Sequence, residues 1–181
     1  MNDRPNDLLL LAGQVLAVLM QIFMAIGAIA LIVATPLLLI FRADVIAEFA
    51  QEAGDPSVVF PLLQLAGVMA IGLAIVVMLF FFFGTLRRII ATVGQGDPFV
   101  PENAARLSLM GWLMLGVQLA LLPAVALGLS LARYADEMDD MNFTVDGGLD
   151  LTGILLVIIL FILARVFKRG AAMRADLEGT V

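Results

Sequence analysis

The residue types that most often carry out chemistry in proteins are scarce in this 181-residue sequence. It has no histidine and no cysteine, so the commonest general base, the commonest metal ligand and any thiolate nucleophile are missing. Ser57, Ser108 and Ser130 therefore have no imidazole partner that could activate a hydroxyl. Because no nucleophile–base pair can be assembled, we expect a protein that is not an enzyme, with no catalytic residue, no cofactor site and no metal site.

Two other motifs resemble binding sites only in part. The densest acidic cluster consists of Asp136, Glu137, Asp139 and Asp140. It lacks the alternating Asp/Asn spacing and the central glycine of a calcium loop. The segment at residues 94–96, Gly-Gln-Gly, lacks the lysine and the Ser or Thr of a phosphate-binding loop. We interpret the acids as a solvated surface and the glycines as part of a turn.

The amino-acid composition indicates whether the chain folds in water or in a membrane. Hydrophobic residues make up 62% of the chain and charged residues 14%, and the mean hydropathy is +1.08. Soluble domains have about 45–50% and about 25%, respectively. A soluble fold of this size could not bury so much apolar surface, and a disordered chain would be far more polar. The sequence therefore predicts an integral membrane protein.

Four segments are apolar enough to cross a bilayer, which takes about 20 residues of helix. Charge-free runs cover residues 8–40, 58–86, 107–132 and 151–164. The last run has only 14 residues. It reaches 19 when it is extended to residues 149–167, with Asp150 at one interface and Arg165 at the other. We predict an all-α integral membrane protein, with residues 1–181 as a single domain. This four-helix transmembrane bundle has spans at residues 14–40, 60–86, 107–131 and 149–167.

Lysine and arginine are distributed unevenly between the segments that join these spans. Only Arg42 and Arg133 lie in the segments at residues 42–57 and 133–148, which together with Asp150 hold ten of the sixteen acids. The remaining eight cations are Arg4, Arg87, Arg88, Arg106, Arg165, Lys168, Arg169 and Arg174. Cations accumulate on the cytoplasmic side of membrane proteins. Both termini are therefore predicted to be cytoplasmic, and the two acidic segments are predicted to be outer loops.

The spans themselves carry no ionisable residue near their middle, which disfavours an ion pathway or a proton relay. Their main polar residues are Gln14, Gln21, Gln64 and Gln118. We interpret these as hydrogen-bonding groups between helices. The alternative is a polar site at mid-membrane, as in a small-solute transporter or an accessory subunit of a transport complex. Alanine and glycine also recur every four residues in two spans, which fits an internal seam or a homo-oligomer equally well.

The cytoplasmic connection at residues 87–106 is predicted to be a structured helical hairpin. The second span continues as helix to residue 93, and Gly94 or Gly96 can end it. A Gly-Asp-Pro reversal follows, and Pro101 suits the first turn of the next helix. We expect Phe99 to pack between the two helix extensions. On the outer side, the spacing of apolar residues at positions 43–53 predicts a short amphipathic helix.

Two segments of the sequence resemble those of a known family. The first combines residues 86–89 (Leu-Arg-Arg-Ile) with residues 96–107 (Gly-Asp-Pro-Phe-Val-Pro-Glu-Asn-Ala-Ala-Arg-Leu), and the second is residues 170–181. Together they are similar to the bacterial membrane family known as domain of unknown function 2975. The family has no established activity or site residues, so the resemblance transfers none. Its members are often encoded beside a small helix-turn-helix regulator, which implies a DNA-binding partner protein.

We therefore expect a multi-pass protein of the bacterial inner membrane whose cytoplasmic face binds or sequesters such a regulator. Besides the lipid bilayer, this regulator is the expected partner, and no direct contact with nucleic acid is expected. The tail at residues 168–181 belongs to this face. The candidate contacts to a partner or to lipid are Arg87, Arg88, Asp97, Phe99, Glu102, Asn103, Arg106, Asp176, Leu177, Glu178 and Val181. A stress or immunity protein that acts through the acidic outer loops is a further alternative.

Overall fold

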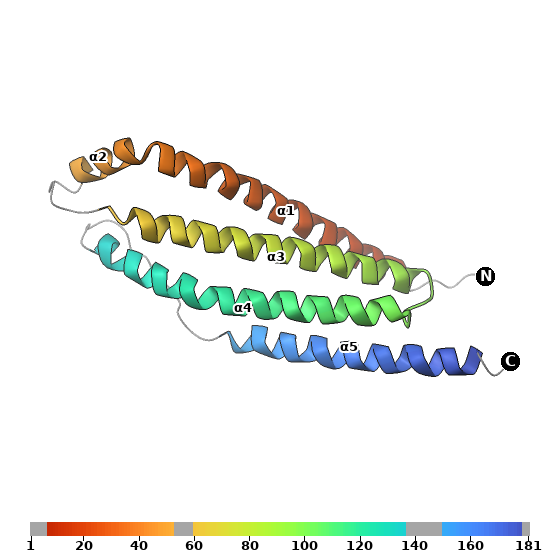
Figure 1. Cartoon of the computed structure of the whole chain (residues 1–181). Coiled ribbons are helices and arrows are strands. Elements are labelled where there is room, and N and C mark those ends of the chain that lie inside the picture. The colour runs from red at the N-terminus through yellow and green to blue at the C-terminus, as the bar shows by residue number, and fades with distance from the viewer. Residues whose placement is uncertain (1–6, 53–59, 137–149, 179–181) are drawn as a thin grey trace. The chain divides into compact units, whose positions relative to one another are not determined.

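The computed structural model describes residues 7–52, 60–136 and 150–178, and over these residues its regular structure is entirely helical (Figure 1). The helices in chain order are α1 (Asp7–Ile40), α2 (Arg42–Glu52), α3 (Leu62–Gly94), α4 (Pro101–Asp136) and α5 (Leu151–Glu178). The all-α prediction is confirmed for this part of the chain. Much of the two predicted outer loops lies outside the described residues.

Four of these helices are long and apolar enough to cross a membrane. The candidate spans are Leu8–Ile40, Leu62–Gly94, Pro101–Ala132 and Leu151–Asp176. Each overlaps one span predicted from the charge-free runs, because the absence of charge and the length of the helix are both properties of the local sequence. Large aliphatic side chains along them are exposed, such as Leu9 at 80% and Leu63 at 83%. Hydrocarbon is the solvent that tolerates this exposure.

The chain forms two compact units. The first consists of Met1–Ala25, Val77–Gln118 and Asp150–Val181. Its core joins α3, α4 and α5 through the buried side chains of Ile89, Leu107, Met110, Leu160 and Ala164. Helix α1 packs on α3, where a side chain at Gly13 would lie 3.5 Å from Ile90. Within this unit, the start of α1, the α3–α4 connection and the end of α5 lie at the same end (Figure 1).

The second unit consists of Ile26–Val76 and Leu119–Leu149. In it, α3 approaches α4 closely at Gly67, where an added Cβ would lie 3.0 Å from Leu127. The amphipathic helix predicted around residues 43–53 is present as α2. Its Phe49 ring packs edge-on against Phe60, with the ring centroids 5.0 Å apart.

Candidate functional site

The α3–α4 connection is a short turn that is fixed by backbone hydrogen bonds. The amide of Asp97 donates to the Thr92 carbonyl at 3.2 Å, and the amide of Gly96 donates to the Val93 carbonyl at 3.0 Å. These two bonds form the Schellman pattern that ends many helices. Gly96 has a φ of 84°, a left-handed conformation that favours glycine. The predicted turn is confirmed, and Gly96 is the one of the two glycines that occupies the left-handed position.

Asn103 lies at the centre of this connection, in the first turn of α4, and is fully buried. Its side-chain amide donates to the Thr92 hydroxyl at 2.7 Å and to the Pro98 carbonyl at 3.0 Å. Its Oδ1 accepts a hydrogen bond from the Arg106 guanidinium at 2.9 Å. Asn103 therefore ties the end of α3, the turn and the start of α4 together with every side-chain donor satisfied.

The Phe99 ring packs against α5, so the expectation that it lies between the extensions of α3 and α4 was wrong. Its centroid is 5.3 Å from that of Phe167, and the rings are tilted by 40°. The contact is possible because residue 170 is glycine, since a Cβ there would come within 2.7 Å of the Phe99 ring. Sequence spacing within the hairpin could not reveal a neighbour 68 residues away along the chain.

A second contact joins the same two elements. The Arg174 guanidinium of α5 forms a hydrogen-bonded ion pair with the carboxylate of Asp97 in the turn. Both side chains are partly exposed, so the pair contributes about 0–1 kcal/mol and serves mainly to orient the elements. We call the contacts of Asp97 and Phe99 with Phe167, Gly170 and Arg174 the hairpin clamp. They bring together the two segments on which the family resemblance rests.

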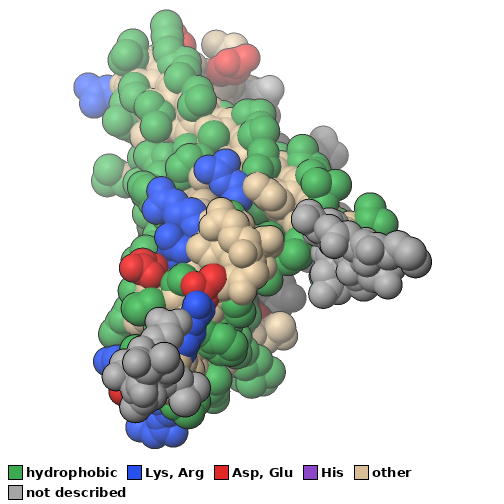
Figure 2. Space-filling model, turned by 90° about the vertical axis from the view of Figure 1, so that its right-hand side faces the viewer, with side chains coloured by type: hydrophobic (Ala, Val, Ile, Leu, Met, Phe, Trp, Pro, Cys, Tyr) green, Lys and Arg blue, Asp and Glu red, His purple; other side chains and the backbone are tan. Residues whose placement is uncertain are grey.

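The surface around the clamp is rich in cations. Arg87 and Arg88 in the last turns of α3 are both exposed. Viewed from this end of the first unit, Lys and Arg side chains gather beside the α3–α4 connection and α5 (Figure 2). The described cations of this end are Arg87, Arg88, Arg106, Arg165, Lys168, Arg169 and Arg174, and the described acids are Asp7, Asp97, Glu102, Asp176 and Glu178. The face therefore carries a net positive charge, which suits acidic partners or anionic lipid.

The structure gives the predicted contact residues different positions. Asn103 is buried, Arg106 donates a hydrogen bond to Asn103, and Asp97 pairs with Arg174 of α5, so we assign these three a positioning role. Glu102 and Asp176 are exposed and remain candidate contacts. Leu177 and Glu178 belong to the last turn of α5, whereas Val181 lies outside the described residues. The tail predicted at residues 168–181 is thus helical up to residue 178.

The sequence interpretation missed Thr92, Phe167 and Gly170 as parts of this site. It also missed an alanine-lined groove between α4 and α5, which has a volume of about 660 Å³. One signal for the groove was present in the sequence, because Ala171 and Ala175 are one helical turn apart, as are Ala104 and Ser108. No comparable signal marked the three contact residues, because their partners lie on other elements.

A separate polar contact lies between α4 and the start of α5. The Gln118 amide donates to both the backbone carbonyl and the carboxylate of Asp150, each at 3.1 Å. The other carboxylate oxygen of Asp150 accepts the amide of Gly153 at 3.0 Å, which caps α5. The prediction that Gln118 hydrogen-bonds between helices is confirmed. Asp150, which was predicted to lie at a membrane interface, contacts Gln118 near the middle of the charge-free run of α4.

The four long apolar helices define the class of the protein, which is an α-helical multi-pass membrane protein. The model of a family described as "Protein of unknown function (DUF2975)" matches residues 43–181, so the chain belongs to that family. The match includes the hairpin and α5, and it confirms the family predicted from these segments. No curated protein and no solved structure matches the chain.

Proposed function

We propose that this chain is a non-enzymatic protein of the bacterial inner membrane that binds a small soluble regulator at the clamped hairpin. The clamp is the observation that supports this proposal. A loop that only connected two spans would need no contacts to a third helix. Here α5 contributes a ring contact, a close approach at Gly170 and an ion pair. The result is a surface whose backbone is ordered before any partner arrives, which lowers the entropic cost of binding.

The charge of this surface suggests the kind of partner. Arg87 and Arg88 present two neighbouring cations that can attract acidic side chains and accelerate encounter. A helix-turn-helix regulator is the class that the family resemblance implies. In the proposal both termini and the hairpin are cytoplasmic, where such a regulator is found. Binding at the membrane would keep it away from DNA.

Capture of the regulator by the tagged full-length protein in mild detergent tests this function. The amounts recovered are compared by quantitative mass spectrometry for the wild type and for an R87E/R88E variant. We expect recovery of the regulator to fall by about tenfold or more, because reversing the two charges replaces attraction with repulsion. The matched control is Arg42→Glu, which reverses an exposed arginine on α2 and should leave recovery unchanged.

Two further variants examine the clamp and the end of α5. Deleting residues 176–181, or replacing Gly96 and Pro98 so that the turn is lost, should each reduce capture of the regulator. The captured protein must also bind directly when both components are purified. Capture that stays unchanged after both the deletion and the loss of the turn contradicts the proposed function.

A component of a transport complex is the second candidate, and the contact between Gln118 and Asp150 favours it. This contact puts a carboxylate beside the middle of the apolar run of α4, and ionisable groups at such depth commonly serve transport. The chain has no cysteine, so a single introduced Leu151→Cys can be labelled without background. Rapid labelling by a charged, membrane-impermeant maleimide would indicate an aqueous path to this level, whereas protection from the reagent would count against transport.

A further inference from the structure

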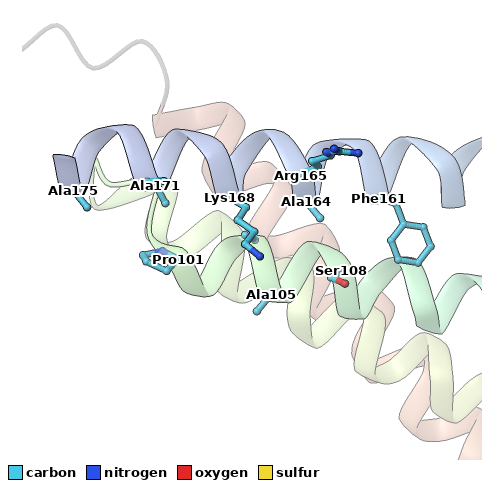
Figure 3. A pocket seen from close by; sticks show the side chains of 11 residues that line it. Pro101, Ala105, Ser108, Phe161, Ala164, Arg165, Lys168, Ala171 and Ala175 are labelled. Atoms are coloured by element: carbon cyan, nitrogen blue, oxygen red, sulfur yellow. The ribbon is translucent and has the colours of Figure 1, made fainter. Parts of the chain in front are cut away.

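The groove between α4 and α5 has an apolar floor and a basic edge. Alanines from both helices form the floor, among them Ala104 and Ala164, which are buried. Lys168 extends from α5 toward α4 across the groove, and Arg165 lies along α5 one turn before it (Figure 3). The volume of about 660 Å³ is in the range of sites for small organic ligands. The groove can therefore take an apolar group with an anionic end.

The aromatic side chain of Phe161 lies at one end of this groove (Figure 3). Phe161 points from α5 toward α4 (Figure 3), and its ring packs edge-on against Trp112, with centroids 5.4 Å apart. It approaches α4 at Gly111, where a Cβ would lie 3.1 Å from the ring. Trp112 itself is 62% exposed beside the groove. An exposed tryptophan is typical of the border between hydrocarbon and headgroups.

The charge pattern of the two helices gives the level of the groove in the membrane. The charge-free run of α4 begins at residue 107 and that of α5 ends at residue 164. Ser108, Ala164 and Phe161 thus line the hydrocarbon side of the groove, while Lys168 lines the headgroup side. The groove crosses the border at which phospholipid phosphates are concentrated. Basic pockets between transmembrane helices at this level bind anionic lipid headgroups.

No acidic side chain lines the groove beside its two cations. Neither Arg165 nor Lys168 forms an ion pair with another described side chain. Their charges are therefore available to a ligand. A surface helix of a soluble partner would be about 10–12 Å wide and would have to enter the lipid layer to reach Phe161. A lipid is already in that layer.

We propose that this groove binds one anionic phospholipid of the surrounding leaflet. The phosphate lies between Arg165 and Lys168, and the upper part of an acyl chain lies against Ala164 and Phe161. The lipid would cover the small-residue surface between α4 and α5 close to the hairpin clamp. This site does not depend on the regulator proposed above.

Native mass spectrometry of the purified full-length protein tests the site. The protein is titrated with phosphatidylglycerol and, separately, with phosphatidylcholine of the same acyl chains. We expect the wild type to retain one phosphatidylglycerol, and an R165Q/K168Q variant to bind it about tenfold more weakly or worse, since both phosphate contacts are lost. Arg169→Gln is the matched control, because Arg169 is an exposed cation of α5 that does not line the groove.

A second variant keeps the charges and fills the space. Ala105→Leu occupies the groove from an exposed position, so we expect it to weaken lipid retention while the thermal unfolding of the protein stays close to that of the wild type. The proposal is overturned if R165Q/K168Q retains the lipid as the wild type does, or if Arg169→Gln weakens retention equally. It is also overturned if a crosslinker at position 105 captures a protein helix in cells and no lipid.

Discussion

At the scale of single residues, Asn103 is a buried polar side chain whose hydrogen bonds are made to other residues of the hairpin. Its side-chain NH2 group donates to the Thr92 hydroxyl and the Pro98 carbonyl, and its side-chain oxygen accepts a hydrogen bond from Arg106. A buried group of this kind contributes little when it is fully bonded, but removing it leaves several partners without a bond. The position is therefore sensitive to substitution because its bonds are internal to the hairpin.

Asn103→Ala is expected to lower the free energy of unfolding of the first unit by about 2–3 kcal/mol, because the Pro98 carbonyl and the Thr92 hydroxyl lose their donor. The chain has one tryptophan, Trp112 in α4, so its fluorescence reports the unfolding of this unit in detergent. The control is Gln95→Ala in the same turn, which is exposed and should change stability by no more than about 0.5 kcal/mol. Equal unfolding midpoints for the two variants would contradict the assigned role of Asn103.

Substitutions at Gly170 and Gly94 test the close approach of Phe99 to α5, because only Gly170 lies against that ring. A methyl group at Gly170 would lie 2.7 Å from Phe99, whereas nothing lies within 4 Å of one at Gly94. Gly170→Ala should therefore displace the Phe99 ring from Phe167 and destabilise the unit by about 1–2 kcal/mol. Gly94→Ala should be neutral, or stabilising by up to about 1 kcal/mol through helix propensity.

Thermal unfolding of both glycine variants, followed by Trp112 fluorescence, measures the difference. Phe99→Ala in the Gly170→Ala background removes the obstructing ring, so the loss in the double variant should be smaller than the sum of the single losses. Additive losses would show that Gly170 and Phe99 do not compete for the same space.

At the scale of elements, the charge-free part of α5 is shorter than the hydrocarbon core of a bilayer. Its charge-free run of 14 residues covers only about 21 Å of the roughly 30 Å of a bilayer core. The capped start of α5 accordingly meets Gln118, near the middle of the 26-residue run of α4. The pairing compensates a carboxylate that would otherwise lie unpaired beside apolar surface.

Gln118→Leu removes both hydrogen bonds from the amide to Asp150. We expect a loss of about 1–2 kcal/mol in stability, because hydrogen bonds between membrane helices contribute about 0.6–2 kcal/mol each. Unfolding in detergent, followed by Trp112 fluorescence, measures the change. Gln14→Leu is the control, since Gln14 on α1 is exposed and makes no hydrogen bond with the described residues. A Gln118→Leu variant as stable as this control would mean that the contact does not hold α5.

The elements were predictable where a local property decides them. Absence of charge located the spans, and the Gly-Asp-Pro segment located the turn, because both depend on neighbouring residues only. The partners of Phe99 and Asn103 were not predictable in this way. Phe99 meets a helix far away in sequence, and Asn103 stands in a polar hairpin, where a polar side chain is ordinarily exposed.

At the scale of the whole molecule, the distribution of cations predicts which side of the membrane each connection faces. Of the ten Lys and Arg residues, eight lie in the N-terminal segment, the hairpin and the second half of α5, and two lie in the acidic connections. Because such a bias sets orientation during insertion, the hairpin should face the cytoplasm and α2 should face the opposite side. A labelling measurement that distinguishes the two sides of the membrane tests this prediction.

Single cysteines placed in a chain that has none give that measurement. Gln51→Cys in α2 and Gln95→Cys in the turn are both at exposed positions. In intact cells with a permeabilised outer membrane, an impermeant maleimide should label position 51 and leave position 95 unlabelled, because lipid separates the reagent from the cytoplasm. Position 95 should become reactive only after the inner membrane is disrupted. Labelling at position 95 in intact cells would place the clamp outside and exclude a cytoplasmic regulator as its ligand.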